Sequence, residues 1–492
     1  MKLTRRTTIA ATLLACLCTT LSAQEPEDVP LRSCRPLMGK GEVPTQMRTL
    51  RRASADDLYT GERRQLVVLV DFSDLSFKEA EPLTLWNKIF NEEGYNESSF
   101  RGSVHDYFFD QSYGKFNLTF DLYHVSLNEA HQKYRSTSYD DENSQFLVND
   151  IMDILKTEDI EWPVYDWDGD GYVDQLLIVY AGKGQNAGGG SDTIWPHQWW
   201  LTKHKDPTTQ EYLPPYAIVY NGIVYLIDSY CAIAEVFKDG SYGTFGTICH
   251  EYSHCFGFPD FYYGSTRIVD HWDIMDSGNM NGGGFCPAGY SAHERMLMGW
   301  LTPVELTGPT QVTGMSPLSS TPEAYLIRND GHANEYYMVE HRIQTGWDEE
   351  LPGSGVVIFH IDYDEELWHS LTNLPNSWSK NECHYTIIHA SDNSNARNWA
   401  YPYAGNDSLT NLSSPAATLR NANADGELFM SKPLYNMASD GNTASFLFMM
   451  TLAEMAVDAP TCDLRKGKEE LYRMGRLHIV RCEDGTVRKE IR

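Results

Sequence analysis

The sequence predicts an α+β fold in which a mixed domain at 61–302 is followed by a β-rich, sandwich-like domain at 303–456. Continuous apolar runs at 64–74 and 172–182 are typical of buried strands. Between them, segment 146–160 has the apolar periodicity of a helix. The second domain instead shows short runs that alternate between apolar and polar residues, which is a pattern typical of β-strands.

Length and composition exclude several classes of protein. The 492 residues are 41% hydrophobic and 12% aromatic, which is ordinary for a globular chain and argues against wholesale disorder. Lys and Arg number 39 and Asp and Glu 68, so the formal net charge is 39 − 68 = −29. Such a charge repels phosphate backbones, so we expect no nucleic-acid partner. It suits an exported soluble protein that binds cations.

Residues 1–23 have the pattern of a signal peptide, because basic residues precede an uncharged run that ends in small residues. No later segment offers about 18 uncharged apolar residues, so we expect no transmembrane segment and a secreted or cell-surface chain. Lipoprotein anchoring at Cys16 is the alternative. Residues 24–60 are polar, with Pro and Arg clusters, and are expected to form a linker or short pro-segment.

The cysteines define no disulfide framework. Loss of the signal peptide removes two of the ten cysteines, which leaves 10 − 2 = 8. Their spacing contains no CxxC pair and no compact cluster, so the disulfide connectivity stays open.

The C-terminal tail, 457–492, differs in charge from the rest of the chain. Its segment 462–492 holds 9 basic and 6 acidic residues, a local +3. The tail resembles C-terminal sorting segments that guide some bacterial proteins across the outer membrane, which suggests contact with secretion machinery. The alternative is a last pair of strands packed on the β-rich domain.

The strongest chemical signal is a metal-binding motif, His250-Glu251-x-x-His254. On a helix, residues four apart point to the same side, so both imidazoles can bind one Zn²⁺. Gly257 permits the chain to leave the helix sharply, and Asp260 can return as the third ligand. Glu251 would then accept a proton from the catalytic water and pass it to the leaving amine.

A second candidate metal site lies upstream, at Asp166, Asp168, Asp170, Tyr172 and Asp174. Four carboxylates and the Tyr172 carbonyl occupy the first positions of an EF-hand-like calcium loop. The bidentate Glu of a complete EF-hand is absent, and a strand follows. We expect a structural Ca²⁺ here that stabilises the loop and the surrounding fold, with a solvated acidic turn as the alternative.

The residues around these motifs identify a family resemblance. The segments HEYSHCFGFPDFY, WDIMDSG, VVLVDFSD, GSVHDYFFDQSYGKF, DWDGDGYVD and IWPHQWW resemble the immune inhibitor A family of secreted bacterial metallopeptidases. The resemblance covers roughly residues 65–300. It implies a zincin catalytic domain of the metzincin type, in which Met275 forms the turn beneath the zinc site.

The resemblance also ranks the remaining site residues. It favours Asp260 over Glu294 as third zinc ligand, because it places helices of the Glu294 type outside the ligand set. Tyr262 and Tyr290 are both candidate donors to the tetrahedral intermediate, and their spacing does not choose between them.

The resulting interpretation is a secreted zinc endopeptidase that hydrolyses peptide bonds in proteins and is stabilised by calcium. The alternative is a non-catalytic, calcium-stabilised surface-binding protein on a metallopeptidase scaffold. The intact His250, Glu251 and His254 favour the enzyme. Cleavage preference, activation and oligomeric state stay open.

Overall fold

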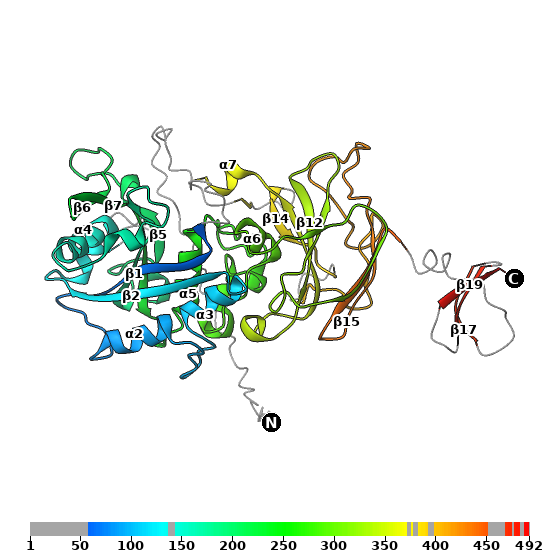
Figure 1. The fold of residues 1–492 in the computed structure, drawn as a ribbon, viewed down its shortest axis with the longest axis horizontal. Coiled ribbons are helices and arrows are strands. Elements are labelled where there is room, and N and C mark those ends of the chain that lie inside the picture. The colour runs from blue at the N-terminus through cyan, green and yellow to red at the C-terminus, as the bar shows by residue number, and fades with distance from the viewer. Residues whose placement is uncertain are drawn as a thin grey trace, which may run out of the picture.

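The computed structural model of the chain describes residues 58–135, 143–370, 375–376, 382–391, 398–450, 468–474, 477–482 and 487–491. The expected signal peptide and nearly all of the expected linker or pro-segment lie outside the described residues. In Figure 1 the mixed sheet with its helices occupies one side of the molecule and the β-rich sheets the other.

A five-stranded sheet organises the mixed region, in the order β2-β1-β4-β8-β5. Its strands are β1 (Gly61–Asp71), β2 (Phe116–Ser126), β4 (Leu176–Lys183), β8 (Ser229–Val236) and β5 (His197–Trp200). The first four run parallel, whereas the edge strand β5 is antiparallel to β8. The central strands are rich in Val, Ile and Leu because helices cover both of their faces.

The covering helices divide between the two faces of this sheet. On one face, α2 (Pro82–Asn91), α3 (Val104–Gln111) and α5 (Phe245–His254) share a hydrophobic core with alternate residues of β1, β4 and β8. The opposite face packs on α4 (Ser144–Leu155) in a second core. The small sheet β3-β7-β6 adjoins it, with β3 at Tyr172–Val173, β7 at Ile223–Ile227 and β6 at Tyr216–Tyr220.

Short connecting elements complete this region. Helix α6 (Ala292–Leu297) is its last helix. Turns of 3-10 helix occur at His131–Tyr134, Trp162–Tyr165, Gln185–Ala187, Leu201–Lys203, Asp270–Trp272, Ser277–Gly284 and, beyond α6, Gly346–Asp348.

Two further sheets form the β-rich region. One has the order β14-β13-β12-β11-β9 and the other β10-β16-β15. Their bounds are β9 Val304–Glu305, β10 Thr310–Met315, β11 Tyr325–Arg328, β12 Glu335–Arg342, β13 Gly355–Asp362, β14 Tyr385–Ile387, β15 Leu434–Ser439 and β16 Ala444–Phe448, with the short helix α7 at Glu365–Trp368. Side chains from both sheets enclose one hydrophobic core.

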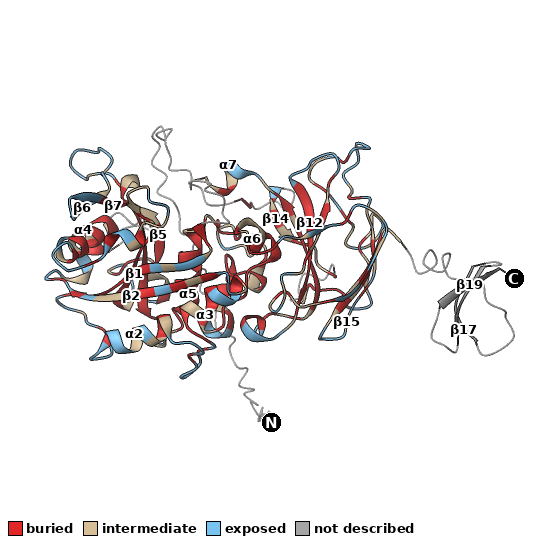
Figure 2. Cartoon of the chain, in the orientation of Figure 1, coloured by how far each residue is buried: buried red, intermediate tan, exposed pale blue. Residues whose placement is uncertain are grey.

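Strands β12 and β13 of the larger sheet are buried on both faces, and β12 is red in Figure 2. Val339 and Ile358 point into the core between the two β-rich sheets. Met338 and Phe359, one residue away along each strand, belong instead to the core that contains α5. The β-rich region therefore supports the helix that carries the metal motif.

The tail contains β17 (Lys468–Met474), β18 (Leu477–Cys482) and β19 (Val487–Ile491), which form an antiparallel three-stranded sheet. These strands pair only with one another among the described strands. In the parts of the chain that the structure describes, no helix is long and apolar enough to cross a membrane.

Candidate metal centre

Three potential ligands converge at the end of α5. Nε2 of His250 lies 3.3 Å from Oδ1 of Asp260, and Nε2 of His254 lies 3.4 Å from the same oxygen. Each residue offers one ligand atom, and the three atoms lie within 4.8 Å of one another. All three side chains are buried.

The sharp exit from α5 brings Asp260 back to the histidines. The backbone N–H of Gly257 donates to the carbonyl of His254 at 2.9 Å, and Gly257 has φ of +89°. Residues with a Cβ disfavour this left-handed region, so glycine is the natural choice. The predicted role of Gly257 is confirmed by this geometry.

Backbone carbonyls orient both imidazoles. Nδ1 of His250 lies 2.8 Å from the carbonyl of Ile274, and Nδ1 of His254 lies 2.7 Å from that of Phe258. A carbonyl only accepts, so each Nδ1 carries a proton, and Nε2 of each ring is the atom that faces the cluster and would bind a metal. Nε2 of His254 is buried without a hydrogen-bond partner. A metal ligand set fits this arrangement.

The cluster attracts positive charge. Burial opposes the charged imidazolium of His250, but its hydrogen bond to Asp260 and the nearby carboxylates raise its pKa to about 9. Burial likewise opposes ionisation of Asp260, yet the neighbouring His254 and His250 lower the pKa of the carboxyl to about 2. A bound divalent cation would supply the positive charge that protonated imidazoles otherwise provide beside Asp260.

Glu251 lies on the same helix, next to the ligand cluster. Its side chain is buried, and Oε2 lies 4.0 Å from Nε2 of His254. A carboxylate at this distance is beside the ligands and close enough to reach a water molecule held by them.

The Met275 turn supports the centre through its backbone. The Met275 carbonyl accepts from the N–H of Phe261 at 2.9 Å, which fixes the residue after Asp260. The preceding carbonyl, of Ile274, orients His250. Met275 itself is fully buried beneath the site, and its N–H donates to Asp273 at 2.8 Å.

Sequence reasoning missed two buried carboxyls that shape this turn. Asp276 accepts three backbone N–H groups, from Ile268, Val269 and Asp270. Burial raises the pKa of Asp276 to about 6. Asp273 accepts from Tyr385 of β14 at 2.8 Å, so the β-rich region reaches the turn directly. Nothing in the local sequence signals a contact 112 residues away.

The alternative ligand Glu294 lies outside the cluster. It occupies a capping box at the start of α6, where Oε2 accepts from the N–H of Ser291 at 2.7 Å and from its hydroxyl at 3.0 Å. Burial, together with the neighbouring carboxyl of Asp273, raises its pKa well above the ordinary value. Its role is to close the helix end.

The two tyrosine candidates differ in their surroundings. Tyr290 is fully buried, and its hydroxyl is hydrogen-bonded to that of Ser253 on α5. Its ring packs against Tyr107 and Phe258. The hydroxyl of Tyr290 is therefore engaged with α5, and its role as a donor stays a prediction. Tyr262 lies two residues after Asp260, and its role stays a prediction.

The acidic loop brings together three of its four aspartates. Carboxylate oxygens of Asp166, Asp168 and Asp170 lie within 4.8 Å of one another. Burial and the neighbouring carboxylates of Asp170 and Asp168 raise the pKa of Asp166. Asp174 is outside this group, and its Oδ2 accepts the N–H of Trp167 at 2.5 Å. Tyr172 begins β3.

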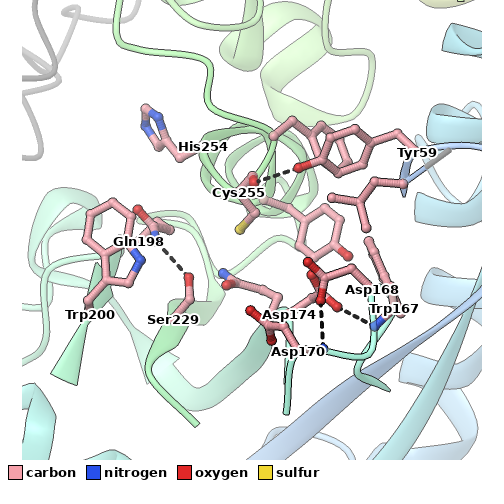
Figure 3. Close-up of a pocket in the computed structure, with 14 residues that line it drawn as sticks. Tyr59, Trp167, Asp168, Asp170, Asp174, Gln198, Trp200, Ser229, His254 and Cys255 are labelled. Carbon is pink, nitrogen blue, oxygen red and sulfur yellow. Dashed lines mark hydrogen bonds between the residues drawn. The ribbon is translucent and has the colours of Figure 1, made fainter. Parts of the chain in front are cut away.

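A pocket lies between this loop and the end of α5. Figure 3 shows His254 and Cys255 on one side and Asp168, Asp170 and Asp174 on the other. Gln198, Trp200 and Ser229 form a third wall, while Tyr59 hydrogen-bonds the Cys255 carbonyl at 3.4 Å. The two candidate metal sites thus border the same hollow.

A helix that supplies two imidazoles and a carboxylate, joined by a returning aspartate, defines the centre of a metallohydrolase. Comparison with known families identifies the family of metallohydrolases. Residues 55–299 match the immune inhibitor A peptidase M6 catalytic domain. The chain belongs to this family of metallopeptidases.

Curated relatives agree with the family. The chain is 28% identical over 294 residues to the pre-pro-metalloprotease PrtV of Vibrio cholerae, covering 49% of this chain and 30% of PrtV. It is 24% identical over 303 residues to immune inhibitor A of Bacillus thuringiensis subsp. alesti, covering 52% of this chain and 42% of that protein. The match therefore spans less than half the length of each relative.

Proposed function

We propose that this chain is an exported zinc-dependent endopeptidase with a zincin catalytic domain. The observation that carries the proposal is the convergence of His250, His254 and Asp260, with Glu251 beside them. The donor set of two imidazoles and one carboxylate suits Zn²⁺ and leaves a position for water. Protein and peptide substrates follow from the family.

Zinc, when bound, polarises the scissile carbonyl and lowers the pKa of the attacking water. Glu251 accepts the proton of that water and then donates it to the leaving amine. The Ile274 and Phe258 carbonyls hold both imidazoles so that Nε2 of each ring faces the metal position. Tyr262 and Tyr290 are the candidate donors to the tetrahedral intermediate.

Substrate orientation can use the edge strand β5. It runs antiparallel to β8, and β8 is its one partner among the described strands. An extended peptide that paired with the other side of β5 would add a strand to the sheet. Gln198 and Trp200 of this strand line the pocket that His254 borders, so side-chain selection can occur there.

A structural calcium ion at Asp166, Asp168 and Asp170 is part of the proposal. The converging carboxylates and the raised pKa of Asp166 support it, because like charges this close need a cation. Export through the N-terminal signal and a sorting role for the tail are proposals of the same kind.

The direct test is casein hydrolysis by the purified full chain. A zinc chelator should abolish cleavage, and stoichiometric Zn²⁺ should restore it while Ca²⁺ alone does not. Cleavage that persists in protein shown to be free of metal would exclude the proposed function and favour another use of the scaffold.

A further inference from the structure

Two cysteines, Cys231 of β8 and Cys255 at the end of α5, bring their sulfur atoms to 3.7 Å from each other. They are 24 residues apart in the chain, and neither is in a disulfide. A disulfide has an S–S distance of about 2.05 Å, so closing the bond requires the sulfurs to approach by about 1.7 Å. Side-chain rotation and a small backbone adjustment can supply that approach.

Both thiols contact the same backbone carbonyl. The Cys231 sulfur lies 3.3 Å from the carbonyl oxygen of Glu251, and the Cys255 sulfur lies 3.9 Å from it. The Cys231 sulfur also accepts from Nε2 of Gln175 at 3.0 Å. The surrounding groups therefore hold the two sulfurs side by side, in positions from which they can react with each other.

The pocket gives reagents a path to one of these sulfurs. Cys255 is partly exposed and lines the pocket, whereas Cys231 is fully buried behind it. In Figure 3 the Cys255 sulfur lies within the ring of labelled side chains. This arrangement gives the two thiols different roles: the accessible one reacts first with the reagent, and the buried one completes the bond.

We propose that Cys231 and Cys255 are a thiol pair that closes to a disulfide by exchange with a small-molecule disulfide. Cys255 attacks the reagent and forms a mixed disulfide, releasing one reagent thiol. Cys231 then attacks the Cys255 sulfur and releases the second. The protein loses two protons and two electrons, and the reagent is reduced to two thiols.

The new bond would tie the end of the metal-binding helix to the central sheet. Cys255 directly follows His254, and Cys231 lies within β8. Such a cross-link restricts the unfolded chain and raises thermal stability. This consequence is independent of peptide hydrolysis, so the proposal stands or falls separately from the proposed function.

Charge predicts which reagent reacts faster. The pocket is lined by Asp168, Asp170 and Asp174 and by no Lys or Arg side chain. An acidic pocket concentrates cations and repels anions. In calcium-free buffer, cationic cystamine should oxidise the pair at least about tenfold faster than anionic oxidised glutathione does.

The test is peptide mapping of the reduced full chain after treatment with cystamine. We expect a cross-linked peptide that joins Cys231 to Cys255, loss of two hydrogen atoms from the intact mass, and a thermal midpoint raised by several degrees. The matched control Cys249→Ser should form the same cross-link, since Cys249 is buried and the sulfur contact is between Cys231 and Cys255.

Cys231→Ser should show neither the cross-link nor the thermal shift. The wild-type peptide map decides the matter even if this variant folds poorly. Failure of saturating cystamine to link Cys231 to Cys255, or linkage of Cys231 to Cys249 instead, would overturn the proposal.

Discussion

At the residue scale, Asp260 and Glu294 separate two possible ligand sets. Asp260→Asn should weaken zinc affinity by more than about 100-fold, because loss of supporting contacts alone costs about 10–100-fold and here a charged ligand is removed. Equilibrium dialysis with zinc measures the effect.

Glu294→Gln is the matched control for that substitution. Gln preserves the capping box, because its amide oxygen can still accept both hydrogen bonds from Ser291. Its zinc affinity should equal that of the wild type. A large loss of zinc in Glu294→Gln with none in Asp260→Asn would reverse the assignment.

The buried carboxyl of Asp276 makes stability depend on pH. Its pKa rises from 3.8 to about 6 on folding, so the folded state holds this proton more tightly than the unfolded state. The associated stabilisation is complete below pH 3.8 and is lost as pH rises through about 6.

Asp276→Asn isolates this effect, because the amide oxygen can still accept the backbone N–H groups and does not titrate. The unfolding free energy of the wild type should fall relative to that of the variant by about 2.4 kcal/mol from pH 4 to pH 7. Denaturant titrations of zinc-loaded protein measure it. A constant difference across this range would show that Asp276 titrates normally.

The proximity of site residues was predictable where one local pattern brings the groups together. His250, Glu251 and His254 are on one helical turn and the next, and Gly257 places Asp260 close by along the chain. The contact between Tyr290 and Ser253 was not predictable, because the two residues belong to different elements. Contacts of this range leave no local signal.

At the element scale, the acidic loop should respond to calcium. With zinc present throughout, added Ca²⁺ should raise the thermal midpoint of the wild type, because it offsets the repulsion among Asp166, Asp168 and Asp170. Asp168→Asn should lose most of that rise. An unchanged midpoint with calcium and with a calcium chelator would argue strongly against a structural ion here.

Elements with a strong local period were predictable from sequence. The expected helix at 146–160 corresponds to α4, and the apolar run at 64–74 to β1. The aromatic segment around His197, IWPHQWW, carried no prediction of a strand. It nevertheless forms β5, because pairing with β8 determines its conformation. A four-residue edge strand has too short a pattern to be recognised alone.

At the scale of the whole molecule, the two regions share a core and should unfold together. Phe359 of β13 is fully buried in the core that includes α5. Phe359→Ala should cost about 3–5 kcal/mol and lower a single calorimetric transition. Two transitions, with the zinc-sensitive one unaffected, would contradict this coupling.

This coupling explains what the sequence did not reveal about the domains. Alternating runs correctly indicated strands beyond residue 302, but period alone cannot tell which partner covers each face of a strand. Residue 359 faces the catalytic region and residue 358 the other sheet. Only the three-dimensional arrangement shows that Tyr385 of the β-rich region bonds Asp273 in the turn beside the metal centre.

The central claim is that Glu251 is the proton-transfer group of a zinc peptidase centre. The most direct measurement is zinc content and casein hydrolysis on the same preparation of Glu251→Gln. The account predicts one zinc per chain, as in the wild type, with hydrolysis reduced by about 10²–10⁴-fold or more. Full zinc occupancy together with wild-type hydrolysis would contradict it.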